Sequence, residues 1–274
     1  MDWNNFYTHY DTLIEQWLND KEREKIIKTD PYFVAQRCRP SNDIYRLSDE
    51  RLEIPEPYFG NPKECSAVII NLNPGKSGNK PERDKHYNTL AGKLANTKYS
   101  CYAKDFPCLE ECHPGYNFWK QKNNWIKRLC NLNDENTLKP FAVELCPYHS
   151  RKWDGSIIDD KVIEYIKEWV IQPALDAVKS SKLPFALAIG KPCYDVLTGN
   201  QLGFCEKKRW TPEDNVCGWP KNGKGNVKRY YVLLGRSDGL KVLCTWCKGG
   251  NSAPAQYFTT VEALISKYIQ EDKC

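Results

Sequence analysis

The sequence predicts an α/β fold, a three-layer α/β/α sandwich built on a mainly parallel sheet of about four strands. Two features support this prediction. Short segments of near-continuous hydrophobicity recur along the chain, as at Ala67–Leu72 and Phe185–Ile189, and segments with helical periodicity separate them. Helices cover both faces of a parallel sheet. Its strands therefore do not alternate between apolar and polar residues as half-exposed strands do. Ligands of such sheets bind at the carboxyl ends of the strands.

The first part of the chain, residues 1–63, is expected to pack on this core. Residues 3–27 carry apolar side chains at the spacing of one amphipathic helix. Residues 29–63 contain five prolines, which predict a loop that wraps around the domain. The core domain is then expected to span residues 64–274.

The elements of the core follow from hydrophobic runs and from helix start and stop signals. Strands are expected at Ser66–Leu72, Phe141–Leu145, Phe185–Ile189, Tyr230–Leu234 and Lys241–Trp246, and helices at about 87–98, 116–131, 159–180, from Pro192 and at 261–270. Asp159 or Asp160 begins the long helix, and Pro173 is expected to bend it because proline lacks an amide hydrogen. Residues 199–229 are rich in Gly, Asn and Lys and predict a basic insertion.

Composition argues for a globular chain outside the membrane. The 274 residues are 41% hydrophobic and 27% charged, and no apolar run is long enough to cross a bilayer. The N-terminus has no signal pattern, so a cytoplasmic location is expected. The 13 cysteines are odd in number, and several lie in apolar segments, which favours free thiols and no bound metal. The two alternatives are metal sites at Cys244 and Cys247 with Cys205 and Cys217, or at Cys101, Cys108, Cys112 and His113.

Basic residues beside aromatic rings suggest that DNA is the partner. The net charge of +5 is small, but Lys and Arg gather with aromatic residues at Lys120–Arg128, Arg151–Trp153, Lys207–Trp210 and Lys221–Arg229. Such clusters suit a phosphate backbone with stacked bases. Arg151 and Lys152 are therefore candidate DNA contacts. For any single cluster, a solvated surface is the alternative.

The strand at residues 66–72 leads into the turn Asn73-Pro74-Gly75-Lys76-Ser77-Gly78. Its spacing is not that of a phosphate-binding P-loop, and by itself it could be an ordinary strand-ending turn. The turn resembles the first motif of the uracil-DNA glycosylase superfamily, most closely the M-N-P-G form of the single-strand-selective monofunctional branch. The strand and glycine of Ala186–Pro192 are also similar to that superfamily. The resemblance covers roughly residues 60–270 and implies a DNA glycosylase that needs no cofactor and leaves an abasic site.

The resemblance assigns roles to the residues of this turn. Asn73 falls where the family positions the attacking water, which an amide oxygen can orient. Gly75 falls where the ubiquitous branch has a tyrosine beside C5 of the base, so the C5 side is left open. The backbone around Gly75 and Lys76 is expected to help bind the base.

The segment Phe141–His149 matches the family's second conserved strand by position. Glu144 is nearest to the asparagine that reads the pyrimidine edge in the uracil enzymes. An ionised carboxylate only accepts hydrogen bonds, so it suits the exocyclic amine of cytosine. Gly75 and Glu144 together indicate a C5-modified cytosine, such as some phage genomes carry, and hence a defence role; uracil stays open. An ion-paired strand-end carboxylate is the alternative for Glu144. Tyr148 is a further candidate for base binding.

The chain departs from the family at its last motif. The H-P-S motif, whose histidine stabilises the leaving base, is replaced within Cys244–Pro254. Lys248 or His149 is expected to take over this catalytic role. The DNA strand is expected to be gripped by Lys248, Gly249, Asn251 and Ser252. Two other classes remain open: a DNA-binding protein without chemistry on a glycosylase scaffold, and a small-molecule α/β hydrolase.

Overall fold

The computed structural model describes residues 1–37, 53–72, 74–75, 80–111, 113, 115–129, 138–150, 155–199, 201–210, 229–247, 254 and 259–271. The helices in this part of the chain are α1 (Trp3–Leu18), α2 (Asp20–Thr29), α3 (Pro31–Arg37), α4 (Lys80–Leu94), α5 (Tyr99–Lys104), α6 (Tyr116–Leu129), α7 (Asp160–Ile166), α8 (Gln172–Val178), α9 (Lys191–Thr198) and α10 (Thr259–Glu271). The strands are β1 (Tyr58–Phe59), β2 (Ala67–Asn71), β3 (Pro140–Glu144), β4 (Ala186–Ile189), β5 (Cys205–Trp210), β6 (Arg229–Gly235) and β7 (Lys241–Cys247).

The strands form one mixed sheet in the order β1-β3-β2-β4-β7-β6-β5. The pairs β3–β2, β2–β4 and β4–β7 are parallel, and β1, β6 and β5 are added antiparallel at the two sides. The carboxyl ends of β3, β2, β4 and β7 therefore lie along one edge of the sheet. The loops that carry the predicted site residues begin at this edge.

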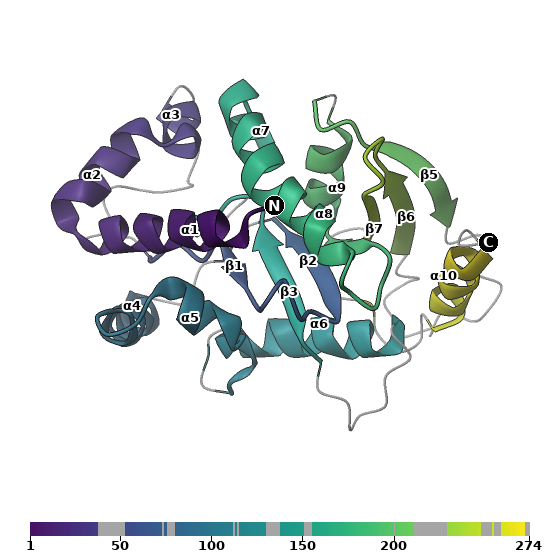
Figure 1. The fold of residues 1–274 in the computed structure, drawn as a ribbon, viewed down its shortest axis with the longest axis horizontal. Helices are drawn as coiled ribbons and strands as arrows, with labels where there is room; N and C mark the ends of the chain where they lie inside the picture. Colours follow the sequence, from purple (N-terminus) through teal and green to yellow (C-terminus); the bar gives the residue numbers. More distant parts are fainter. Residues whose placement is uncertain are drawn as a thin grey trace.

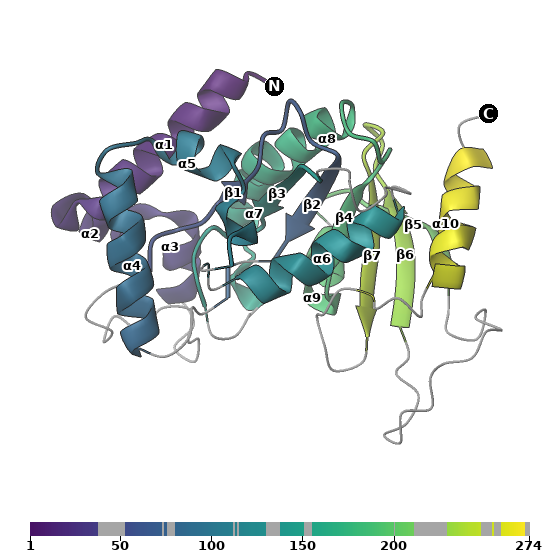
Figure 2. The same ribbon diagram turned by 90° about the horizontal axis from the view of Figure 1, so that it is seen from below.

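Helices cover both faces of this sheet (Figures 1 and 2). The helix α6 runs across one face, and α7, α8 and α9 lie on the other. The residues of β2, β3 and β4 are all buried, as expected for strands covered on both sides. The α/β prediction is thereby confirmed. Among the described residues, no helix combines the length and the apolar character that a membrane span requires.

The predicted number of about four strands is wrong, because the sheet formed by the described residues has seven. The four parallel strands have apolar sequences, whereas the missed strands lack that signal. The two residues of β1 are too few to show a pattern. Strand β5 is mostly charged, with five of its six residues exposed, because it is an edge strand that pairs only with β6.

The N-terminal amphipathic segment forms two helices rather than one. The buried stripe of α1 is Phe6, Tyr10, Ile14 and Trp17, and Phe6 packs against Tyr58 of β1 with ring centroids 4.8 Å apart. The helix stops at Asn19, whose side-chain oxygen accepts the amides of Lys21 and Glu22 and so begins α2. The prediction of one helix across 3–27 missed this internal cap.

The predicted loop at 29–63 is wrong at Pro31–Arg37, which form α3. Proline suits the first turn of a helix because the first amides have no partner within the helix. Asp30 caps this end, since its Oδ1 accepts the Tyr32 amide at 3.0 Å. The two residues of β1 also fall within the predicted loop, and residues 38–52 lie outside the described part of the chain.

Asp30 gives a pH-dependent prediction. Burial raises the pKa of this carboxyl from 3.8 to about 6, against hydrogen bonds from the Tyr148 hydroxyl and backbone amides that lower it. A raised native pKa means that the carboxyl stabilises the fold when protonated, and this stability is lost as pH rises through about 6. Asp30→Asn should therefore raise the free energy of unfolding by about 1–2 kcal/mol at about pH 8 and by almost nothing at about pH 4.

The measurement is urea unfolding of both proteins across this pH range. The matched control is Asp159→Asn at the cap of α7, where the carboxylate accepts the Val162 amide at 2.9 Å. Asn caps a helix about as well as Asp does, so the control should show little change in stability at either pH. A pH-independent effect of Asp30→Asn would contradict the prediction.

The long predicted helix at 159–180 is continuous but irregular. Asp159 caps α7, as one of the two predicted start residues, and a π-helical turn at Lys167–Ile171 joins α7 to α8. Pro173 has no amide to donate to the carbonyl of Trp169 four residues earlier. That carbonyl accepts the Tyr10 hydroxyl at 3.2 Å instead. The helical hydrogen bond that is lost at Pro173 is thus replaced by one that attaches α1 to the long helix.

Candidate strand-end site

The last residues of β2 and β3 meet in a buried polar cluster. Asn71 and Glu144 are paired in register, and Asn71 Nδ2 donates to Glu144 Oε1 at 2.8 Å. On the other side, Lys122 of α6 donates from Nζ to Asn71 Oδ1. The exposed fractions are 4% for Asn71, 5% for Glu144 and 2% for Lys122, so water screens these charges little. We call these three residues the strand-end triad.

Burial sets the electrostatics of the strand-end triad. It raises the pKa of Glu144, an effect that the Lys122 charge and the Asn71 hydrogen bond reduce. Burial also lowers the pKa of Lys122, and the Glu144 charge opposes this. The state in which Glu144 and Lys122 are both charged and the state in which both are neutral are thereby brought closer in free energy. Asn71 bridges the two groups.

One oxygen of Glu144 is not satisfied. Its Oε2 is buried and has no hydrogen-bond partner in the described part of the chain. An unpaired buried acceptor costs about 1–3 kcal/mol, so this oxygen is a natural acceptor for a ligand donor. The Lys122 ammonium lies over two rings, 3.9 Å from the Phe118 centroid and 4.5 Å from that of Trp119. These contacts hold the cation on the strand-end side of α6.

The loops after β2 and β3 continue side by side beyond the strands. The amides of Leu145 and Cys146 donate to the carbonyls of Asn71 and Leu72, at 2.8 and 3.0 Å. Further on, Gly75 pairs with Ser150 in an isolated parallel bridge. A Cβ atom placed on Gly75 would meet no described atom within 4 Å. The turn is thus tied to the loop that follows Glu144, and no described residue fills the space beside Gly75.

His149 fastens these loops together. Its Nδ1 lies 2.8 Å from the carbonyl oxygen of Gly75 and 2.7 Å from Glu53 Oε2, and its Nε2 lies 3.1 Å from the carbonyl oxygen of Ile54. Burial lowers the pKa of His149, but the Glu53 hydrogen bond and the charges of Glu56 and Glu53 outweigh it and raise the pKa to about 9. Both nitrogens are therefore protonated and occupied. The ring holds Gly75 in place, and neither ring N–H is free to donate to a leaving base, the catalytic role expected from the sequence.

Tyr148 is placed in the core. Its ring packs against Trp17 and Phe33, with centroids 5.4 and 4.6 Å apart, and its hydroxyl donates to Asp30 Oδ2 at 2.7 Å. A fully buried ring with an occupied hydroxyl has no face left for a base, so the base-binding assignment of Tyr148 is not supported by its position. Its contacts attach the N-terminal helices to the loop after β3.

The structure thus brings Gly75, Glu144 and His149 to one edge of the sheet. The remaining predicted site residues lie outside the described residues; they are Asn73, Lys76, Arg151, Lys152, Lys248, Gly249, Asn251 and Ser252.

Sequence reasoning missed Lys122 and Asn71. A signal for Lys122 exists, because it falls within the buried stripe of α6 together with Trp119, Trp125, Ile126 and Leu129. An ionisable residue at a core position of an amphipathic helix indicates a buried partner. Asn71 similarly ends an otherwise apolar strand.

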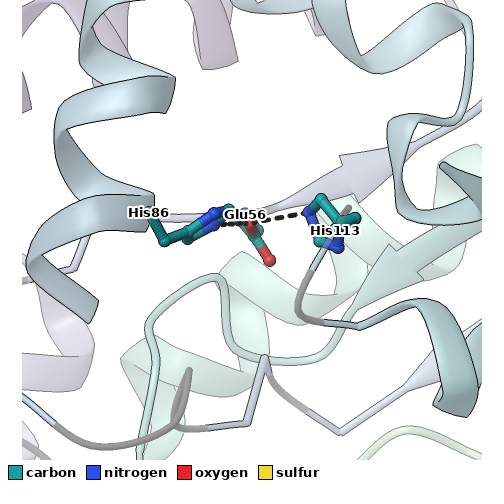
Figure 3. A group of neighbouring side chains, drawn as sticks. All are labelled: Glu56, His86 and His113. Atoms are coloured by element: carbon teal, nitrogen blue, oxygen red, sulfur yellow. Dashed lines mark hydrogen bonds and ion pairs between the residues drawn. The ribbon is translucent and has the colours of Figure 1, made fainter. Parts of the chain in front are cut away.

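A second polar cluster lies on the segment that leads into β1. Glu56 Oε1 is 3.3 Å from His86 Nε2 of α4 and 3.9 Å from His113 Nε2 (Figure 3). The ligand atoms that Glu56, His86 and His113 offer all lie within 4.8 Å of one another. Cys108 Sγ is 3.8 Å from His113 Nε2. Three of the four histidines of the chain, including His149, thus surround Glu56.

Comparisons of the chain with protein-family models, with curated proteins and with solved structures found no match. The two clusters must therefore be interpreted from their own chemistry.

Proposed function

We propose that the protein is a monofunctional DNA glycosylase that hydrolyses the N-glycosidic bond of a flipped-out, C5-modified pyrimidine, with modified cytosine as the preferred base. The observation that carries this proposal is the buried Glu144 carboxyl, whose Oε2 has no partner among the described residues. It ends the strand next to the one that leads into Asn73-Pro74-Gly75. The parallel order β3-β2-β4-β7 supports a sheet of the uracil-DNA-glycosylase kind, with the motif residues at its carboxyl edge.

The strand-end triad offers the groups needed to read a cytosine edge. The carboxylate oxygen accepts from an exocyclic amine, and it discriminates against uracil, which has a carbonyl oxygen at that position. Asn71 fixes the other carboxylate oxygen through the 2.8 Å hydrogen bond, so the free oxygen has a defined direction. The absence of a described atom within 4 Å of a Cβ on Gly75 leaves room for a substituent at C5.

Lys122 supplies the positive charge that the last family motif would have supplied. Hydrolysis of the glycosidic bond leaves negative charge on the departing base, and a buried cation nearby lowers the energy of that state. Lys122 is held by Asn71 and by the rings of Phe118 and Trp119, so little reorganisation is needed. We assign the attack on the sugar to a water positioned by Asn73.

Basic residues on the outermost strand of the sheet support DNA as the partner. Strand β5 exposes Lys207, Lys208 and Arg209 at the side of the sheet. The Arg209 guanidinium lies 5.8 Å from the ring centroid of Tyr194 and 6.0 Å from that of Trp246, which is next to the carboxyl end of β7. Cations beside rings suit a phosphate backbone with neighbouring bases.

The experiment is excision from four DNA substrates, containing uracil, cytosine, 5-hydroxymethylcytosine or glucosylated 5-hydroxymethylcytosine. Alkali-labile abasic sites are expected with the modified cytosines. Glu144→Gln should reduce their excision by about 10²–10³-fold, the usual effect of losing one preorganised transition-state contact. Any uracil excision should fall less, because the amide of the introduced Gln can still donate a hydrogen bond to the carbonyl oxygen of uracil.

The matched control is Glu262→Gln on α10, another buried carboxyl, which pairs with Arg128 of α6 at 2.9 Å. This control should keep activity within about three-fold, since it is not part of the proposed transition-state contacts. Equal losses on modified cytosine and uracil would refute the role of Glu144. DNA binding without abasic sites would favour a non-catalytic scaffold, and no salt-dependent DNA binding would favour a small-molecule hydrolase.

A further inference from the structure

We propose that Glu56, His86 and His113 form a binding site for a divalent transition metal ion, with zinc as the best-suited ion. The three side chains come from separate segments and point toward one another (Figure 3). Neither the base-recognition argument nor the water attack uses them, so this site goes beyond the proposed glycosylase activity.

The distances between the side chains suit zinc. In a tetrahedral site with ligand bonds of 2.0–2.1 Å, ligand atoms lie about 3.3–3.5 Å apart. Glu56 Oε1 lies 3.3 Å from His86 Nε2 and 3.9 Å from His113 Nε2. All three ligand atoms fall within 4.8 Å of one another. An ion can therefore be accommodated by shifts of a few tenths of an ångström to about one ångström.

The ligand types favour zinc over the common hard cations. Magnesium and calcium take oxygen ligands, whereas two imidazoles with one carboxylate are typical of zinc. Cys108 Sγ lies 3.8 Å from His113 Nε2, close enough to become a fourth ligand. The side chains of Glu56, His86 and His113 are 8%, 14% and 9% exposed, so the site is enclosed but not sealed.

Each ligand is held by its own segment. The Glu56 amide donates to the carbonyl of Pro147 at 2.9 Å, which attaches its segment to the loop after β3. His86 lies on α4, whose only fully buried apolar residue with a described side chain is Leu90. The other apolar residues of α4 that pack against the core, Tyr87, Ala91 and Leu94, are only partly buried. A metal ion bound by His86 would attach α4 to the rest of the fold.

Metal binding replaces the His86–Glu56 hydrogen bond and also changes that of His113. Coordination through His113 Nε2 places the ring proton on Nδ1, which now accepts the Gly115 amide at 3.0 Å. That hydrogen bond must therefore break when the ion binds. One backbone hydrogen bond is weak beside the ligand bonds of a three-residue zinc site. The change also provides a spectroscopic signature, because the environment of the Gly115 amide differs between the metal-free and metal-bound protein.

The test begins with protein stripped by a chelator and then titrated with zinc or cobalt(II). We expect one ion per chain, a zinc-dependent rise in Tm, the visible absorption of four-coordinate cobalt and a shift of the Gly115 amide resonance. His86→Gln and His113→Gln should each weaken binding by at least about 100-fold. Amide hydrogen exchange in α4 should slow with zinc in the wild-type protein and not in these variants.

His9→Gln is the matched control, because His9 stacks on Trp169 with centroids 3.7 Å apart and lies outside the cluster. It should bind zinc as the wild type does. Unchanged affinity in His86→Gln would overturn the proposal by placing the ion elsewhere, for example among the cysteines. Absence of both the cobalt spectrum and the Tm shift would overturn it directly. Excision assayed with chelator present tests the proposed function separately.

Discussion

Replacing Lys122 by Met is expected to lower the free energy of unfolding by about 3 kcal/mol at about pH 7.5, because Glu144 is then left as a buried charge without its partner. The loss should shrink toward about pH 6. Burial already raises the pKa of Glu144, and removal of the Lys122 charge raises it further. A raised native pKa means that the stability of the variant is kept at low pH, where the carboxyl is protonated, and lost as pH rises.

The double variant Lys122→Met with Glu144→Gln separates stability from activity. It removes both charges, so it should recover most of the lost stability at about pH 7.5, while both the single and the double variant lose base excision. Urea unfolding across the pH range measures the first effect, and abasic-site formation measures the second. The same pair of changes at Arg128 of α6 and Glu262 of α10, a partly buried ion pair, should leave excision intact. A double variant no more stable than Lys122→Met would refute the coupling.

Gly60→Ala is expected to prevent folding or to cost more than about 4 kcal/mol, well above a usual core substitution. Gly60 has a φ of +91°, and an added Cβ would lie 2.0 Å from the carbonyl oxygen of Pro140. That oxygen belongs to the first residue of β3 and cannot move without displacing the strand. The Gly60 amide also donates to the carbonyl of Ala103 at 2.8 Å, so the glycine cannot move away either.

Gly239→Ala provides a close control for this prediction. Gly239 has the same φ of +91°, but an added Cβ would meet no described atom within 4 Å. It should therefore show the backbone strain alone, about 1 kcal/mol. Thermal or urea unfolding of the two variants isolates the clash with Pro140. Similar losses in both would show that the approach of Gly60 to β3 is not as close as the structure places it.

The parallel centre of the fold was predictable because burial on both faces requires continuous apolar sequence. Strand β4, Ala186–Ile189, falls within the predicted Phe185–Ile189. The elements that were not predicted depend on pairing and capping contacts. Strand β5 is stabilised by pairing with β6 despite its charged sequence, and α3 depends on a cap and a proline that also fit a loop. Propensity and periodicity do not report such tertiary pairing.

The part of the candidate site that lies at the ends of the strands was predictable. Glu144 could be identified because it ends a strand, and the loops after parallel strands meet at one edge. Lys122 approaches from α6, and Glu56, His86 and His113 share no spacing motif, since their proximity arises from folding alone. The role of His149 also depends on partners from a distant segment, Glu53 and Ile54. Single-sequence patterns contain no direct signal for such contacts.

The pairing of the turn after β2 with the loop after β3 has a consequence for how this protein can change during evolution. The Ser150 amide donates to the carbonyl of Pro74, and His149 holds the carbonyl of Gly75, so each loop fixes the register of the other. An insertion in one loop alone would separate these partners. We expect the two loops to be inherited as a unit in any descendants of this chain, with lengths that change together or not at all.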